Sequence, residues 1–293
     1  MLRSVRAFFA ERGVIEVATP VMGAHGNPDA EIDGIRTAAG AHLQTSPEFA
    51  MKRLLCAGSG DIFQIAPAFR SGESGRGHLP EFTLLEWYRI GFDEFDLIGE
   101  VEDLLAGLLD VQVRRRVRYA EAFAGALGCD PFSASGARLR DLLHERIAWR
   151  GAPPERRACQ QILFAHCVEG GFAQDELTTV HHYPPEQAAL ARIDAVDGVR
   201  VARRFEVYCG GWELANGYFE LADAEEHRRR FARDNMERRL RGEDPVEPQP
   251  EFLRALEDPG LPDCSGVALG LDRVLALQLH QSDLRSVVPT DED

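Results

Sequence analysis

A charged, glycine-rich loop at residues 70–78 carries the side chains best suited to bind phosphate. Arg70, Arg76 and His78 are potential positive donors in this loop, and Glu73 lies among them. Guanidinium groups match phosphate oxygens with paired hydrogen bonds, so such a cluster is typical of a polyphosphate site. Glycines within the loop allow backbone conformations that other residues resist. The loop is therefore predicted to hold the phosphates of a nucleotide.

The segment that follows, residues 80–89, presents four side chains on one face of a predicted strand. Successive side chains of a strand point to opposite faces, so Phe82, Leu84, Glu86 and Tyr88 lie together. A carboxylate and a phenol on an otherwise apolar face suit a pocket that needs a few fixed polar groups. The apolar segment before the loop also has the pattern of a strand. We therefore predict a hairpin with a nucleotide at its loop and a second, cationic ligand on its strand.

Two further acids, Glu213 and Glu220, lie on either side of an Asn216-Gly217 step. Seven residues apart on a regular strand, the acids would point to opposite faces. A bulge at the Asn216-Gly217 step would bring them to one side, where a pair of carboxylates could hold Mg²⁺ for a nucleotide. The alternative interpretation is two unrelated surface acids.

An arginine interrupts an apolar segment near the end of the chain. Residues 265–279 have the pattern of an apolar strand that runs into an apolar helix carrying one charged pair, Asp272 and Arg273. A guanidinium is costly to bury unless an anion matches it. Arg273 is therefore predicted to be a site residue rather than a surface residue.

Helical segments are predicted around these residues. Amphipathic spacing predicts helices from residue 2 to Gly13 and over residues 93–110. Glutamate–arginine pairs four residues apart and a glycine stop predict another over residues 224–242. Another helix is predicted to start at residues 46–48, with Ser46 as its cap, Pro47 at its first position and Glu48 in its first turn. From the residues alone, simple capping is the favoured interpretation of these three positions.

The composition is that of a globular protein, with 293 residues, of which 44% are hydrophobic and 28% charged. A net charge of −15 argues against a protein that coats nucleic acid. Six cysteines show no metal-ligand spacing and are interpreted as reduced thiols. No apolar run approaches the length of a membrane span and no leader is evident, so we expect a cytoplasmic protein without a membrane anchor.

Several of these segments together resemble a known family. FRSGESGRGHLPEFTLLEWY is similar to motif 2 of the class II aminoacyl-tRNA synthetases, and GVALGLDRV is similar to their motif 3. RAFFAERGVIEVATPVM resembles motif 1. TSPEFAMKRLL, PEFTLLEWY and ELANGYFEL resemble the lysyl-tRNA synthetase branch. The similarity extends over nearly the whole chain and is loosest at residues 111–175.

This resemblance implies an α+β fold with an antiparallel sheet flanked by helices, and a homodimer. It implies one catalytic domain over residues 1–293 with a helical insertion around residues 111–175. Lysyl-tRNA synthetases carry an anticodon-binding domain before motif 1, and we expect none here. Ala268 stands where the tRNA enzymes usually have glycine. Both departures are similar to the branch of the family that modifies elongation factor P.

That branch implies a ligase that activates (R)-β-lysine or lysine with ATP as an aminoacyl-adenylate. The acyl group would then pass to a lysine side chain of elongation factor P. One alternative is a truncated synthetase that charges tRNA or a small molecule, although the acidic balance disfavours tRNA. Another is a non-catalytic regulatory subunit, which would be expected to lack the phosphate-binding arginines. The sequence leaves the choice between α-lysine and β-lysine open.

The resemblance assigns the nucleotide contacts residue by residue. Arg70 would hold the α-phosphate and Arg273 the far end of a bent ATP, and both would be catalytic because they stabilise charge at phosphorus. Phe82 would stack on adenine, and Gly270 would let the backbone approach the nucleotide. The adenine contact could shift to Glu73 or pass to the backbone. The remaining positions assigned to ATP are Ser71, Gly72, His78, Glu213 and Leu214.

The resemblance also assigns the amino-acid pocket. Glu86 and Tyr88 would bind the ε-ammonium group of the substrate. Ser46, Glu48 and Asn216 would orient its other amino group and its carboxylate. The remaining positions assigned to the substrate are Pro47, Glu220 and Ala268. Glu213 and Glu220 are the predicted Mg²⁺ ligands, and Glu220 is also assigned to the substrate.

Overall fold

The computed structural model describes residues 1–152 and 154–289. The chain forms two compact units. The first comprises Met1–Leu97 and Phe219–Asp293, and the second comprises Ile98–Tyr218. We predicted one domain over residues 1–293 with an insertion around residues 111–175. The division into two compact units does not test this, and it stays a prediction.

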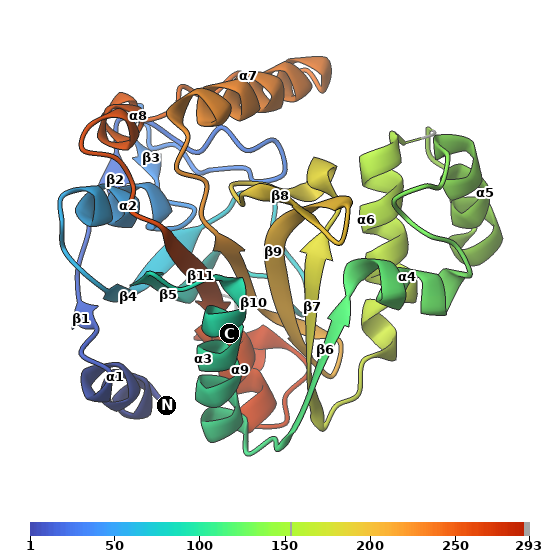
Figure 1. Cartoon of the computed structure of the whole chain (residues 1–293), viewed down its shortest axis with the longest axis horizontal. Coiled ribbons are helices and arrows are strands. Elements are labelled where there is room, and N and C mark those ends of the chain that lie inside the picture. The colour runs from blue at the N-terminus through green and yellow to red at the C-terminus, as the bar shows by residue number, and fades with distance from the viewer. Residues whose placement is uncertain (153, 290–293) are drawn as a thin grey trace. The chain divides into compact units, whose positions relative to one another are not determined.

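The first unit is built around three antiparallel strands that include the predicted hairpin (Figure 1). The hairpin strands pair with each other, and the second of them also pairs with the strand near the end of the chain. A short strand after the first helix adds to the hairpin in parallel. These strands are β1 (Ile15–Glu16), β4 (Ile62–Phe69), β5 (Glu81–Ile90) and β11 (Cys264–Gly270). The predicted strands at both places are confirmed.

Strand β5 is buried on both of its faces. On one face, Leu85 and Trp87 are fully buried. There the ring of Phe9, from helix α1 (Leu2–Glu11), stacks on Phe63 at 4.4 Å and meets Trp87 edge-on at 5.3 Å. Because this face is closed by aromatic packing, the polar side chains of the other face are fixed on a rigid strand.

Helices and a small hairpin complete the first unit. The helices are α2 (Glu48–Cys56), α7 (Ala224–Leu240), α8 (Pro250–Glu257), α9 (Leu271–Gln278) and the 3₁₀ turn η3 (Leu284–Ser286). Phe49 anchors α2 because its ring stacks on Phe252 of α8 at 4.8 Å and meets Phe231 of α7 edge-on at 5.9 Å. The small hairpin consists of β2 (Met22–Gly23) and β3 (His42–Leu43).

Helix α2 starts one residue later than predicted. Pro47, with ψ of 4°, occupies the N-cap position, and the first helical residue is Glu48. Ser46 Oγ accepts a hydrogen bond from the backbone N–H of Glu48 at 3.3 Å. Ser46 therefore still satisfies a backbone donor at the helix start, but from one position before the N-cap.

The second unit contains a mixed set of strands. The strands are β6 (Val113–Arg118), β7 (Glu176–Tyr183), β8 (Ile193–Val196), β9 (Val199–Cys209) and β10 (Trp212–Phe219). Three of them pair antiparallel in the order β10, β9, β7, while β6 pairs in parallel with β7 and β8 pairs antiparallel with β9. Mainly antiparallel strands with helices beside them confirm the predicted α+β class.

Helices fill much of the segment predicted as a helical insertion. They pack a core with β6, β7 and β9 in which Tyr119 stacks on Phe164 at 4.5 Å. The elements are α4 (Tyr119–Leu127), α5 (Gly136–Ile147), α6 (Arg156–Cys167), and the 3₁₀ turns η1 (Glu169–Gly171) and η2 (Pro185–Gln187). Helix α3 (Glu94–Leu109) begins in the first unit and ends in the second.

The cysteines and the lengths of the helices bear on two predictions about the chain as a whole. All six cysteines are free thiols. Over the described residues, each helix is too short or too polar to cross a lipid bilayer.

Candidate active site

Arg70 lies at the start of the loop predicted to bind phosphate, directly after β4. Its guanidinium lies 3.5 Å from the carboxylate of Glu73 and 5.0 Å from the ring centroid of Phe82. Its Nε atom is buried and has no hydrogen-bond partner among the described residues. A buried guanidinium nitrogen with unused donor capacity fits an anionic ligand, because leaving such a group unpaired is costly.

Arg273 lies in the first turn of α9 and reaches the same loop. Its Nε donates a hydrogen bond to the carbonyl of Gly77 at 3.3 Å. Asp272 accepts a hydrogen bond from the backbone N–H of Thr83 at 2.7 Å, which ties the start of α9 to β5. The structure therefore brings the two predicted catalytic arginines to one loop, and Arg273 is partly rather than fully buried.

His78 lies in this loop beside the arginines. Desolvation, followed by the positive charge of Arg273, lowers the pKa of its imidazole. The neutral imidazole is therefore favoured near neutral pH in the absence of an anion. A polyphosphate bound between the arginines would act in the opposite direction and favour the imidazolium form.

Glu86 and Tyr88 form a buried hydrogen-bonded pair on β5. The hydroxyl of Tyr88 donates to Glu86 Oε1 at 2.7 Å, and each residue is only 2% exposed. Strand β11 runs alongside, with Ala268 opposite Glu86 and Gly266 opposite Tyr88. A Cβ atom at Gly266 would lie 2.3 Å from the Tyr88 ring and 2.5 Å from Glu220. The absence of a side chain there leaves the space that both polar groups occupy.

The carboxyl group of Glu86 is poised to receive a cation. Burial, followed by the nearby charge of Glu48, raises its pKa to about 8, although the Tyr88 hydrogen bond opposes the shift. Burial likewise raises the pKa of Tyr88 well above its usual value. Glu86 Oε2 is buried and has no hydrogen-bond partner among the described residues. At neutral pH Glu86 is therefore mostly protonated, and an arriving ammonium group would favour its ionisation.

Lys52 completes this pocket, and the sequence-based interpretation missed it. Its side chain is 0% exposed, and its Nζ atom lies 2.6 Å from a carboxylate oxygen of Glu48 and 2.6 Å from one of Glu220. Burial lowers the pKa of Lys52, but the charges of Glu220 and Glu48 outweigh this effect and raise it overall. Lys52 is therefore a charged ammonium group held between two predicted substrate-binding carboxylates.

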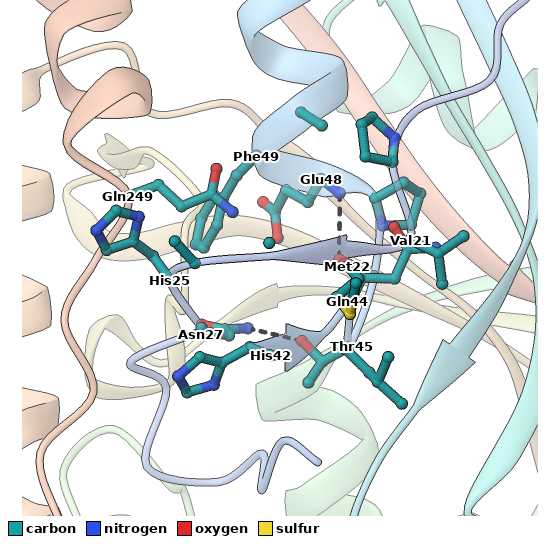
Figure 2. A pocket seen from close by; sticks show the side chains of 18 of the residues that line it. Val21, Met22, His25, Asn27, His42, Gln44, Thr45, Glu48, Phe49 and Gln249 are labelled. Carbon is teal, nitrogen blue, oxygen red and sulfur yellow. Dashed lines mark hydrogen bonds between the residues drawn. The ribbon is translucent and has the colours of Figure 1, made fainter. Parts of the chain in front are cut away.

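A cavity of about 370 Å³ lies beside the start of α2 (Figure 2). The predicted substrate residues Ser46, Pro47 and Glu48 line part of its wall. Asn27 and Thr45 also line it, and a hydrogen bond of 3.3 Å joins them. The side chain of Glu48 is 17% exposed, whereas that of Glu220 is 1% exposed. Of the two carboxylates that hold Lys52, Glu48 is thus the one that reaches a cavity.

Three predicted site residues belong to the second unit, on β10. Glu213 pairs with Tyr208 in the strand register, Leu214 is buried, and Asn216 Oδ1 is buried without a hydrogen-bond partner among the described residues. The register shift lies between Glu213 and Ala215, so the expected bulge at Asn216-Gly217 is wrong in its position. Leu214 is the residue without a cross-strand partner there, while Asn216 and Gly217 pair regularly.

The predicted site residues in the first unit come from a few rigid elements and the loop between them. They are Ser46, Pro47, Glu48, Arg70, Ser71, Gly72, Glu73, His78, Phe82, Glu86, Tyr88, Glu220, Ala268, Gly270 and Arg273. Glu213 and Glu220 lie in different units, and their pairing as metal ligands stays a prediction. In the described part of the chain, no three His, Cys, Asp or Glu side chains are grouped to hold a metal ion.

Comparison with known proteins gives a consistent result. The family profile of tRNA synthetases class II (D, K and N) matches residues 1–290. The elongation factor P--(R)-beta-lysine ligase of Haemophilus ducreyi is 44% identical over 300 residues, which cover 98% of this chain and 90% of the relative. The protein of the same name from Pseudoalteromonas translucida is 44% identical over 302 residues, covering 99% and 93%. With a family profile that spans nearly all of it, this chain belongs to the class II tRNA synthetases of the D, K and N group.

Proposed function

We propose that this chain is an ATP-dependent ligase that activates a lysine-type amino acid and transfers it to a lysine side chain of elongation factor P. The observation that carries the proposal is the cluster of Glu48, Glu86 and Glu220, in which the last two are buried and Glu48 lines the cavity beside α2. Its three carboxyl groups exceed the single ammonium of Lys52, and Glu86 Oε2 is unpartnered among the described residues. Such a pocket suits a ligand with two ammonium groups. Relatives with this ligase name align over 98–99% of the chain.

The first reaction is activation of the amino acid. A carboxylate oxygen of the substrate attacks the α-phosphorus of ATP, the bond from that phosphorus to the bridging oxygen breaks, and pyrophosphate leaves. Negative charge builds on the phosphate oxygens during this step. We assign its stabilisation to Arg70, whose Nε lacks a partner among the described residues, and to Arg273, which contacts the same loop.

The amino-acid pocket would hold the substrate during activation. Glu86 and Tyr88 are assigned to one ammonium group, because Glu86 Oε2 can accept a hydrogen bond and β5 holds both side chains rigidly. Glu48 and Glu220 are assigned to the other ammonium. The ion pair of Glu220 with Lys52 favours this substrate role over metal binding, because an ammonium group already lies 2.6 Å from its carboxylate.

The second reaction is transfer. The amine of the acceptor lysine attacks the acyl carbon of the adenylate, the carbon–oxygen bond to AMP breaks, and the amine loses a proton as the amide forms. The chain need not supply a nucleophile, because the mixed anhydride is already reactive and docking of the acceptor positions the amine. We propose Mg²⁺ with Glu213 as one ligand, whose charge would neutralise the polyphosphate when bound. A cytoplasmic homodimer completes the proposal.

The test is ATP–pyrophosphate exchange with (R)-β-lysine, with α-lysine and with no amino acid, followed by mass measurement of added elongation factor P. We expect exchange that depends on a lysine isomer and a mass increase of one acyl group on the factor. The matched pair of variants is Arg70→Met and Arg239→Met. Arg239 is an exposed arginine on α7, so it controls for the loss of one positive charge.

The outcomes separate the parts of the proposal. Loss of exchange in Arg70→Met with normal exchange in Arg239→Met supports the phosphate role of Arg70. Exchange without a mass increase on the factor would contradict the proposed acceptor and leave the activation step standing. An absence of exchange with every lysine isomer would contradict the ligase function itself.

A further inference from the structure

We propose that Lys52 is a positioning residue for the amino-acid pocket: it fixes the carboxylates of Glu48 and Glu220 and matches the pocket's charge to a substrate with two ammonium groups. This inference rests on the proposed function. Lys52 touches neither of the reacting groups assigned above. It acts through the two glutamates, which it joins across different elements, because Glu48 lies in α2 and Glu220 follows β10.

The composition of the chain points to a specific need for lysine at this position. Lys52 is the only lysine among the 33 basic residues, and all the others are arginines. At every other basic position the chain has arginine, but at Lys52, where the side chain is 0% exposed, it has an ammonium group. An ammonium is compact and can donate to two carboxylates that approach from different directions, whereas a planar guanidinium fork requires more space. The 2.6 Å contacts on both sides leave no such space.

The charge of the pocket supports the same role. Glu48, Glu86 and Glu220 would carry three negative charges if all were ionised, and Lys52 cancels one of them. The remaining two match the two ammonium groups of lysine or β-lysine. Without Lys52, the carboxylates of Glu48 and Glu220 would face each other with no cation between them, and their repulsion would move them from the positions that hold the substrate.

The other titratable groups around Lys52 carry no charge near neutral pH. Burial lowers the pKa of His227, on α7, to about 3, and its Nε2 lies 2.8 Å from the carbonyl of Leu221. Burial raises the pKa of the Cys56 thiol, on α2, and of the Cys264 thiol, on β11. The charge balance around Lys52 is therefore set by the three glutamates.

The alternative is that Lys52 only stabilises the fold. The first experiment distinguishes this structural role from the positioning role. Exchange kinetics are measured for Lys52→Met and Lys52→Arg, with Arg239→Met as the control for charge loss. In Lys52→Met we expect the KM for the lysine-type amino acid to rise about tenfold or more, while the KM for ATP stays within about twofold. Lys52→Arg should keep the positive charge but bind the amino acid more weakly, because a guanidinium needs more space between the two carboxylates.

A second measurement needs no variant. Because the chain has one lysine, isotopic labelling of lysine in the full-length protein gives a single side-chain NMR signal that belongs to Lys52. We expect this signal to keep the chemical shift of a charged ammonium beyond the ordinary lysine pKa, because Glu220 and Glu48 raise the pKa of Lys52. It should move when (R)-β-lysine or α-lysine saturates the protein and stay in place with leucine or with ATP alone.

The outcomes distinguish this inference from the proposed function. A folded Lys52→Met variant whose amino-acid KM stays within about twofold of the wild type would overturn the role of Lys52. So would a lysine signal that does not move while lysine-dependent exchange is present. If the wild-type protein shows neither exchange nor a shifted signal with any lysine isomer, the proposed function itself fails. If Lys52→Met does not fold, the NMR measurement alone decides.

Discussion

Each unit of the chain contains a buried network of glutamate, tyrosine and a basic residue, but the two networks differ in their balance. In the second unit, Glu206 of β9 is surrounded by matching donors. Its Oε2 accepts hydrogen bonds from Tyr183, at 2.6 Å, and from Tyr208, and its Oε1 accepts from Arg204. Arg204 also donates to the carbonyl of Gln187 at 2.7 Å. One carboxylate is thus paired with one guanidinium, and both carboxylate oxygens are satisfied.

In the first unit, the acids outnumber the basic residue. Glu48, Glu86 and Glu220 share one lysine and one tyrosine, and Glu86 Oε2 is left without a partner among the described residues. A balanced network stabilises the fold by itself, whereas an unbalanced one is complete only when a ligand supplies the missing donors. The comparison suggests that a surplus of buried acceptors of one sign, rather than burial of charge as such, marks a binding site.

The largest effect on stability is expected in the balanced network. Glu206→Leu leaves Arg204 buried without its carboxylate, so the free energy of unfolding should fall by about 3–5 kcal/mol. Urea denaturation followed by circular dichroism measures this. The control is Arg114→Met, which breaks an exposed ion pair with Asp103 of 2.6 Å in the same unit and should cost at most about 1 kcal/mol. Equal losses in the two variants would show that the Glu206 network is not a structural pair.

The opposite pattern is expected in the unbalanced network. Glu86→Leu removes a carboxyl group that is mostly protonated at neutral pH, so the protein should be as stable as the wild type or more stable. The kcat/KM for the lysine-type amino acid should fall about 100-fold, or about 2.7 kcal/mol, because the ammonium loses its acceptor. Denaturation and exchange kinetics on the same preparation measure both. A Glu86→Leu variant that unfolds readily but activates the amino acid normally would show that Glu86 stabilises the fold and does not bind the substrate.

An intermediate effect is expected from filling the space beside the unbalanced network. In Gly266→Ala the added methyl group would lie 2.3 Å from the Tyr88 ring and 2.5 Å from Glu220, so these side chains must move. We expect a stability loss of about 1–3 kcal/mol and a weaker affinity for the amino acid. Gly125→Ala, on α4 where a Cβ would meet nothing within 4 Å, is the matched control. Normal amino-acid binding by Gly266→Ala would mean that the pocket does not use this space.

The smallest expected effect is the release of a proton from Glu86 when the amino acid binds. The pKa of Glu86 is raised to about 8, so its protonated form stabilises the fold below the unfolded pKa, and this contribution is lost as the pH rises through about 8. Binding of an ammonium reverses the preference and releases a proton at pH 7. Calorimetric titration with lysine isomers in buffers of different ionisation enthalpy should show a release approaching one proton, with affinity rising by up to about tenfold per pH unit below pH 8. Titrations that agree in all buffers would contradict this protonation state.

The sequence predicted the strands of the first unit well because period-2 alternation and a loop with charged residues are local signals. Glu86 and Tyr88 share a face as expected, since alternation follows from backbone geometry alone. The sequence could not show that Leu85 and Trp87 are buried as well, because their burial depends on Phe9, far away in the chain. The shift of the bulge to Leu214 depends on pairing with β9 and likewise has no local signal.

Lys52 was missed because a basic residue in a short helix is usually solvent-exposed. Two signals in the sequence could have indicated it. Glu48 and Lys52 are four residues apart, the spacing of an ion pair on one helix face, and Lys52 is the only lysine of the chain. Basic side chains elsewhere do face solvent. Arg114, Arg116 and Arg118 of β6 pair with Asp103, Glu102 and Asp197 within the second unit and remain 37–47% exposed.

The burial of Lys52 also determines whether the protein itself can be acylated on a lysine side chain. Lysine side chains are the targets of acylating reagents and, under the proposed function, of the adenylate that this chain would produce. The only lysine here is fully enclosed and charged, so no lysine side chain of the ligase competes with its acceptor. Any acyl-lysine found by peptide mapping after the reaction then belongs to the acceptor, and a lysine-directed label added to the mixture marks the partner.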